Sequence, residues 1–501
     1  MKKAILASIF ILALLLYISC GKDDDPTPDP EPQEVEITSF SPTSGTVGTE
    51  VTINGKNFSS TKTENSVTFN GTAATVKEAL ATQLTVEVPS GASTGPIKVT
   101  VGSSSDISAT DFEVLETAEP VSITGFAPKN GDFETIVTID GSNFSETLAE
   151  NIVKFGEIQA EVTGATTSKL NVKVPNGANT TLISVTVGEN TAETQEYFKL
   201  PIWRKLDDFP GTARRSAFSS VVDGIAYVGM GIGDGNLYDI RSYDYITNTW
   251  QEVAPYPGEG NIAPAEFVVD GTTYVLDGLL GGEGLWSNEF RSYDVETNEW
   301  TDLQDFPGLV RYRATSFTYQ ERGYVVGGLT DTNTSLADVW EYNNNDGTWI
   351  EKQSYPQPDG IYDATSFVID GQAYMGTGGL GTGSESSSHF YKFDGTNWTA
   401  IANLPQSAYS RSGAVGFAIN GKGYVGLGRN HENYLYLQDF YEYDPVANSW
   451  TRLDDFPSHG RSSATAFVLD GKAYVGLGDA GGDLDEQQDI YLFDPANIAP
   501  E

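Results

Sequence analysis

The chain has 501 residues, with 69 acidic and 29 basic side chains, which give a formal net charge of −40 at pH 7. Nucleic acid is excluded as an expected partner, because non-specific binding to it depends on neutralising phosphates with Lys and Arg. The single cysteine, Cys20, excludes a disulfide within the chain. The length is sufficient for several domains.

Residues 1–19 read MKKAILASIFILALLLYIS, and Cys20 follows directly. Two lysines before an apolar stretch too short to span a membrane securely predict a secretory signal. The layout resembles the signals of bacterial lipoproteins cut by signal peptidase II, although Tyr17 stands where Leu is commoner. The resemblance implies lipidation of Cys20. The alternative is an ordinary signal followed by an incidental cysteine.

Residues 20–34 form an acidic, proline-rich segment with nothing to bury, which predicts an extended tether. An acidic run after a lipidated cysteine resembles the surface-export signals of some Gram-negative lipoproteins. It implies an outer-membrane protein that faces the cell exterior, and the alternative is a plain solvated spacer. No later segment is apolar and long enough to cross a membrane, so we expect the mature chain to be anchored through Cys20.

Residues 35–116 and 120–200 are two copies of one repeat. Short alternating strands separated by Gly and Asn turns predict two β-sandwiches. The copies share Gly55-Lys56-Asn57-Phe58 and Gly141-Ser142-Asn143-Phe144, and they resemble the IPT/TIG immunoglobulin-like family. The resemblance implies spacers or interaction modules. Neither copy contains a cluster of titratable residues, so we expect a stalk.

Residues 201–499 carry a second repeat of about 50 residues, the period typical of kelch repeats. Each unit has an aromatic residue or Leu before Pro, an alternating run, a hairpin turn and a strand that opens on Tyr. The turn is Asp-Gly or Asn-Gly in five of the units, which favours two-residue hairpins. The unit therefore predicts four antiparallel strands. Its tryptophans mark six units: Trp203, Trp250, Trp300, Trp349, Trp398 and Trp450.

The register of this repeat predicts how the ring closes. The last unit ends at Phe493-Asp494 with no Trp after it, while Trp203 precedes the first unit. Residues 202–206 are therefore expected as the outer strand of the last blade, which removes a free sheet edge. Residues 201–494 resemble the kelch family. The expected fold is all-β: two tandem immunoglobulin-like β-sandwiches followed by a six-bladed kelch β-propeller closed by its N-terminal strand.

The candidate ligand-binding residues lie near the long loops of the propeller, since binding usually resides in loops on a rigid scaffold. Four arginines occupy one repeated position at the channel mouth, where guanidinium groups can capture carboxylates, or can instead tie blades together. Exposed aromatic rings in the upper loops can stack on a ligand. The predicted ligand-binding residues are Arg214, Arg311, Arg411, Arg461, Trp286, Tyr434 and Tyr436.

Acid–base chemistry at the same mouth is a second possibility, with solvated loop residues as the alternative. The residues concerned are Glu266, Tyr362, Asp363, Tyr409 and His459. No catalytic residue, metal or cofactor is assigned, and the acidic loop at 479–489 lacks the spacing of a calcium loop. The copper chemistry of galactose oxidase, a kelch enzyme, is excluded because the only cysteine lies at the anchor. The sialic acid mutarotases resemble this chain only at the level of the repeat.

We therefore expect a surface-tethered lipoprotein whose propeller loop face binds an extracellular ligand, with a glycan preferred. One alternative is a sugar mutarotase or epimerase, and whether the chain is an enzyme stays open. A second alternative is a protein–protein interaction scaffold. The expected partners are the membrane, through Cys20, and an extracellular glycan or protein.

Overall fold

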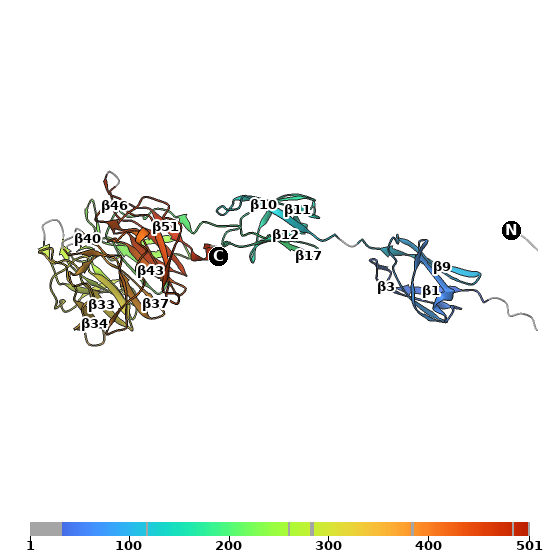
Figure 1. Cartoon of the computed structure of the whole chain (residues 1–501), viewed down its shortest axis with the longest axis horizontal. Coiled ribbons are helices and arrows are strands. Elements are labelled where there is room, and N and C mark those ends of the chain that lie inside the picture. The colour runs from blue at the N-terminus through green and yellow to red at the C-terminus, as the bar shows by residue number, and fades with distance from the viewer. Residues whose placement is uncertain are drawn as a thin grey trace, which may run out of the picture. The chain divides into compact units, whose positions relative to one another are not determined.

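The computed structural model describes residues 33–116, 119–258, 261–280, 285–381, 385–482 and 485–498. These residues form β-strands and short 3₁₀ helices, without an α-helix (Figure 1). In the described part, no helix has the length and apolar character needed to cross a membrane. The predicted signal and Cys20 lie outside it. Contacts divide the chain into Met1–Pro120 and Val121–Glu501.

The first unit is a β-sandwich. Its four-stranded sheet has the order β1 (Glu36–Ser41), β3 (Glu50–Lys56), β7 (Gln83–Glu87), β6 (Val76–Leu80). Its five-stranded sheet has the order β2 (Ser44–Gly45), β9 (Ser104–Val114), β8 (Gly95–Val101), β4 (Asn65–Phe69), β5 (Thr72–Ala74). The core includes Phe69 and Phe112, whose rings meet edge-on at 5.1 Å.

The second unit begins with another sandwich of the same design. One sheet has the order β10 (Ser122–Ala127), β11 (Ile136–Ser142), β15 (Lys169–Lys173), β14 (Glu161–Thr166). The other has the order β13 (Ile158–Gln159), β12 (Asn151–Phe155), β16 (Ile183–Val187), β17 (Asn190–Glu193). Phe155 and Phe198 repeat the edge-on contact of the first core at 5.3 Å.

The shared Gly-x-Asn-Phe motif has a steric cause. A Cβ atom at Gly55 would lie 2.1 Å from the carbonyl oxygen of Glu36 and 2.3 Å from the ring of Phe58. Only glycine therefore lets the phenylalanine fold back into the core beneath its own strand. Asn57 continues the chain with φ of 60°, a conformation that Asn tolerates better than most residues.

The rest of the second unit contains six four-stranded sheets within the described residues, which we call blades. Each blade is named from its inner to its outer strand. Blade 1 is β19 (Phe218–Val222), β20 (Ile225–Gly229), β23 (Ile240–Asp244), β24 (Thr249–Val253). Blade 2 is β26 (Ala265–Val269), β27 (Thr272–Leu276), β30 (Phe290–Asp294), β31 (Glu299–Asp302). Blade 3 is β32 (Thr315–Tyr319), β33 (Arg322–Val326), β34 (Val339–Asn343), β35 (Thr348–Lys352).

The remaining blades follow the same order. Blade 4 is β37 (Thr365–Ile369), β38 (Gln372–Gly376), β41 (Phe390–Phe393), β42 (Trp398–Ala400). Blade 5 is β43 (Val415–Ile419), β44 (Lys422–Gly426), β47 (Phe440–Asp444), β48 (Ser449–Arg452). Blade 6 is β49 (Thr465–Leu469), β50 (Lys472–Gly476), β51 (Ile490–Phe493), β18 (Trp203–Lys205). Neighbouring inner strands contact one another all round, from β19 through β49 and back to β19, which makes a closed propeller.

The closing strand is the predicted one. β18 pairs antiparallel with β51, with Trp203 opposite Phe493. The Trp203 side chain is buried, and its ring lies 4.8 Å from Phe440 and 5.3 Å from Phe456. The fold class predicted from the sequence, with two immunoglobulin-like sandwiches before a kelch-type propeller, is confirmed.

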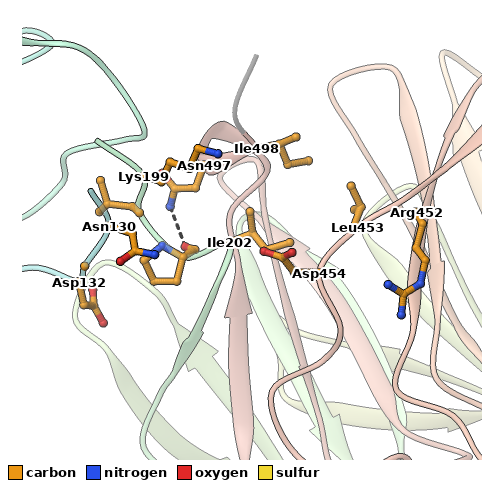
Figure 2. Close-up of a pocket in the computed structure, with 12 residues that line it drawn as sticks. Asn130, Asp132, Lys199, Ile202, Arg452, Leu453, Asp454, Asn497 and Ile498 are labelled. Carbon is orange, nitrogen blue, oxygen red and sulfur yellow. Dashed lines mark hydrogen bonds between the residues drawn. The ribbon is translucent and has the colours of Figure 1, made fainter. Parts of the chain in front are cut away.

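A buried clamp between Thr180 and Asn497 joins the second sandwich to the propeller. The backbone amide of Thr180 donates to Oδ1 of Asn497 at 3.0 Å, and the Thr180 hydroxyl donates to the Asn497 carbonyl at 3.0 Å. The Asn497 side chain donates to the carbonyl of Pro201 at 3.1 Å (Figure 2). Asn497 ends a short 3₁₀ helix, Pro495–Asn497. Beside the clamp lies a groove of about 690 Å³.

Candidate functional site at the mouth of the propeller channel

A central channel of about 220 Å³ is lined by residues at and just before the six inner strands. Most of these residues are Ser, Thr, Ala or Gly. The charged residues that line it are Glu266, Arg313 and Asp363. The chemistry of the channel is therefore concentrated in blades 2 to 4.

The mouth of the channel is built on a ring of left-handed residues. One residue in each blade has φ between 49° and 61°: Ser216, Ala263, Arg313, Asp363, Gly413 and Ser463. The amide of each of five of them donates to the carbonyl of its counterpart in the preceding blade, as Asp363 does to Arg313 at 2.9 Å. This conformation costs a non-glycine residue about 1–2 kcal/mol. The ring therefore holds its side chains at fixed positions around the mouth.

Arg313 and Asp363 form an ion pair within this ring. Their side chains are 3.1 Å apart, and the Arg313 guanidinium also lies 5.2 Å from the ring of Tyr312. Burial raises the pKa of Asp363, and the positive charge of Arg313 opposes that rise. The mouth thus presents a cation and an anion side by side, on backbone that cannot easily move.

Glu266 lies on the inner strand β26 and lines the channel, while its neighbours Ala265 and Phe267 are buried in the core. The backbone amide of Glu266 donates to the hydroxyl of Ser316 in the neighbouring blade at 3.0 Å. Burial raises the pKa of the Glu266 carboxyl to about 8. A carboxyl group with such a pKa is largely protonated at neutral pH, and it can donate or accept a proton there.

The four repeated arginines lie inside the blades, not at the ligand-facing surface. Arg214, Arg311, Arg411 and Arg461 are at most 1 % exposed. Each guanidinium donates hydrogen bonds to both carboxylate oxygens of an aspartate in its own blade. These aspartates are Asp239, Asp338, Asp439 and Asp489. Each also donates to a backbone carbonyl, as Arg411 does to Leu427 at 3.0 Å. These contacts fit the structural alternative and leave no exposed guanidinium for a ligand.

The sequence contains a signal for these pairs. The residue before the third strand is Asp in the four blades that carry the arginine. In the two blades without it, Asn261 is matched by Glu289 and Ile361 by His389. Because the two positions change together among repeats, the aspartate could have been assigned as the partner of the arginine.

The predicted aromatic residues lie on two of the short hairpins above the blades. Trp286, on β29 (Leu285–Trp286), meets the ring of Tyr312 edge-on at 5.3 Å. Tyr434 and Tyr436 belong to the hairpin of β45 (Arg429–Asn430) and β46 (Leu435–Tyr436), and Tyr434 is 73 % exposed. The structure thus places a partly buried ring on blade 2 and an exposed ring on blade 5.

The candidates for acid–base chemistry are not all brought together. Tyr362 is 3 % exposed, and burial raises its pKa. Tyr409 and His459 are exposed, and their carbonyls accept hydrogen bonds from Arg411 and Arg461. Glu266 and Asp363 are the two of this group that line the channel. Among the described residues, no group of three or more His, Cys, Asp or Glu side chains is placed to hold a metal ion.

Arg429 was missed by the sequence analysis. Its guanidinium lies 5.5 Å from the ring of Tyr434 and 5.3 Å from the ring of Tyr436. Its backbone pairs with that of Ser412, at the start of the channel wall. The corresponding hairpin residue of blade 6 is Asp479, so the repeat itself does not point to a cation here.

Comparison with known families agrees with this architecture. The IPT/TIG domain model matches residues 36–113 and 120–199, and the KLHDC2/KLHL20/DRC7 Kelch-repeats domain model matches residues 263–482. The chain combines two IPT/TIG domains with a kelch-repeat domain. A solved structure titled "Structure of YjhT" is similar at 15 % identity, over 57 % of this chain and 96 % of that one, with a TM-score of 0.49. No curated protein matches the chain.

Proposed function

We propose that the kelch propeller binds an extracellular glycan at the mouth of its channel. Kelch propellers and IPT/TIG domains support a binding or interaction role in general. The observation that carries the glycan proposal is the Arg313–Asp363 pair, held between the aromatic hairpins of blades 2 and 5. Aromatic faces suit the C–H surface of a sugar ring, and a few fixed polar groups can orient its hydroxyls.

The three parts of this site follow one another around the ring. Trp286 extends from blade 2 to Tyr312 of blade 3, Arg313 and Asp363 join blades 3 and 4, and Tyr434 lies on blade 5. A saccharide over the channel mouth would thus meet aromatic, charged and again aromatic groups. The Arg313 guanidinium can donate and the Asp363 carboxylate can accept hydrogen bonds, which strengthen in a water-poor site.

The binding test uses the mature chain from residue 20, with Cys20→Ala, on a glycan array. For a glycan that the unsubstituted protein binds on the array, Trp286→Ala and Tyr434→Ala should each weaken binding by about 2- to 10-fold. This is the range expected for one aromatic contact. Tyr197→Ala, an exposed tyrosine of the second sandwich, is the matched control and should bind normally. A silent array, or equal binding by all three variants, would rule the proposal out.

A sugar mutarotase or epimerase is the second candidate, and Glu266 is the observation that favours it. A carboxyl group with a pKa of about 8 can exchange a proton with a ring or hydroxyl oxygen at neutral pH. The array-positive sugar should then show enzyme-dependent exchange between anomers by NMR, which Glu266→Gln should abolish. If proteins but no sugars bind the loop face, the scaffold alternative stands.

We further propose that Cys20 carries a lipid and that the protein faces the cell exterior from the outer membrane. The order of charged, apolar and cysteine residues supports the anchor, and the acidic run after Cys20 supports export. Cys20→Ala should abolish labelled fatty-acid incorporation and release the chain from membranes. Membrane retention of the variant would contradict the anchor. Protection of the propeller from protease in intact cells would contradict surface exposure.

A further inference from the structure

The cations around the channel mouth differ in whether they have a counter-charge. Arg313 pairs with Asp363, and Arg215 pairs with Asp479 at 3.5 Å and with Glu486 at 3.0 Å. Among the described residues, the Arg429 side chain has neither a carboxylate at ion-pair distance nor a hydrogen-bond acceptor. Arg429 thus differs from Arg215 and Arg313, the other arginines at the mouth, in having no carboxylate at ion-pair distance.

The guanidinium of Arg429 is nevertheless held in place. It is within cation–π distance of two rings, at 5.5 Å from Tyr434 and 5.3 Å from Tyr436. The Tyr436 hydroxyl donates to Oδ2 of Asp479 at 3.3 Å, which steadies that ring. Tyr434 keeps its ring over the cation with φ of 55°, a conformation that costs energy for a bulky residue. The side chain is therefore ordered without any ion pair.

One donor of this group is both buried and unsatisfied. Nε of Arg429 is inaccessible to solvent and has no hydrogen-bond partner in the described part of the chain. A buried donor without an acceptor is costly, and its presence in a native fold calls for an explanation. Nε itself is closed to a ligand, so an incoming anion would meet Nη1 and Nη2, which are not among the buried side-chain nitrogens without a partner.

Arg429 also lies next to the proposed site. The Arg429 amide donates to the Ser412 carbonyl at 2.8 Å, and Ser412 directly precedes Gly413 of the left-handed ring. The Ser412 hydroxyl is 2.6 Å from Nε2 of His431, and the His431 ring lies 6.4 Å from that of Tyr362. The Arg429 backbone is therefore fixed beside the left-handed ring of the mouth.

We propose that Arg429 is the anion-recognition group of this mouth, and that the ligand is a saccharide carrying a carboxylate or a sulfate. The proposal rests on glycan binding as the proposed function and narrows the class of glycan. A planar guanidinium fork matches the two oxygens of a carboxylate or sulfate. Anion recognition thereby moves from the four buried arginines, which already bind aspartates, to Arg429, which binds no carboxylate.

The test measures binding of three saccharide probes, and of a hexaglutamate peptide as a non-saccharide anion, by the full mature chain with Cys20→Ala. The saccharide probes are a galacturonate oligosaccharide, a sulfated dextran oligosaccharide and neutral dextran of the same length. Wild-type protein should prefer at least one charged probe, and the preference should weaken with added salt. Arg429→Ala should lower affinity for that probe by about tenfold or more, as expected for loss of a charge-assisted hydrogen bond. Arg429→Lys keeps the positive charge but loses the planar guanidinium group, so it should recover part of the lost affinity.

The matched control is Arg322→Ala. Arg322 opens β33 in the hairpin of blade 3 and lacks an ion pair in the described residues, so its removal changes the net charge equally. It should bind as wild type does. Melting temperatures of all variants identify any loss of fold. Recovery of affinity in Arg429→Lys then shows that the Ala variant lost binding through its charge, and no recovery shows that it lost the packing of the side chain.

The outcomes separate the two proposals. If neutral dextran binds as well as the charged probes and Arg429→Ala binds like Arg322→Ala, the anion proposal fails and glycan binding stands. If a hexaglutamate peptide binds in an Arg429-dependent manner and no saccharide does, glycan binding fails and the ligand is an acidic protein segment. If none of the probes binds and the array is silent, both proposals fail.

Discussion

The buried arginines of the propeller are stable only because each blade supplies its own counter-charge. Taking an ion out of water costs several kcal/mol, and good two-pronged geometry with further hydrogen bonds offsets that cost. Arg411 meets both requirements, since it pairs with Asp439 at 2.7 Å and donates to the Leu427 carbonyl at 3.0 Å. The pair is therefore a unit, and its two members should not be replaceable one at a time.

Arg411→Ala should lower the free energy of unfolding by about 3–5 kcal/mol, because it leaves the Asp439 carboxylate buried without its partner. Denaturation in urea measures the loss. Blade 4 provides a matched rescue, since it carries Ile361 and His389 at the equivalent positions. The double variant Arg411→Ile with Asp439→His should be more stable than Arg411→Ala alone. Unchanged stability of Arg411→Ala, together with lost ligand binding, would restore the ligand role of these arginines.

For single residues, the repeat predicts which positions are equivalent but not what each side chain contacts. The repeat places Arg311 and Arg313 two residues apart, yet one is buried in its blade and the other lines the channel. The left-handed backbone at Arg313 makes that difference, and no residue type there signals it, since its counterparts are Ser, Ala, Asp and Gly. Arg429 escaped notice for a related reason, because its role depends on two rings across a hairpin.

Hairpins were the most predictable elements of the chain. Asp-Gly and Asn-Gly turns adopt the expected left-handed pair of conformations, as Asp370 and Gly371 do at 48° and 74°. Blade 3 makes the same turn with Gln320 and Glu321, at 49° and 58°. Its sequence carries no such signal, so the paired strands on either side impose the turn. The short hairpins over the loop face were unpredicted, because two-residue strands leave no periodic pattern.

The closure of the propeller could be predicted from the sequence because it follows from the number of repeat units and tryptophans. Six tryptophans in phase and a last unit without its outer strand leave one place for Trp203, and β18 occupies it. The clamp between sandwich and propeller could not be deduced. Thr180 and Asn497 are 317 residues apart. Thr180 repeats Thr94 of the first sandwich, and Asn497 follows the last blade, so neither repeat indicates a contact between them. Contacts between domains depend on how the surfaces of two folded domains pack, which the pattern within each repeat does not determine.

The clamp makes the second sandwich depend on the propeller for part of its stability. Thr180 is nearly buried, and its amide and hydroxyl both bond to Asn497. Arg204 of β18 adds a cation–π contact at 4.9 Å with Phe133 of the sandwich. We expect Asn497→Ala to leave the Thr180 amide and the Pro201 carbonyl without their buried partner, at a cost of about 1–3 kcal/mol for each unsatisfied group.

Calorimetry of the mature chain should then show the second sandwich unfolding about 4–8 °C or more below its wild-type transition, the shift expected per kcal/mol for a domain of this size. The propeller transition should move less, because its ring is closed by β18 and does not use the clamp. Asn345→Ala, at an exposed turn of blade 3, controls for loss of an asparagine. Identical traces for the two variants would show that the sandwich and the propeller are stable independently of Asn497.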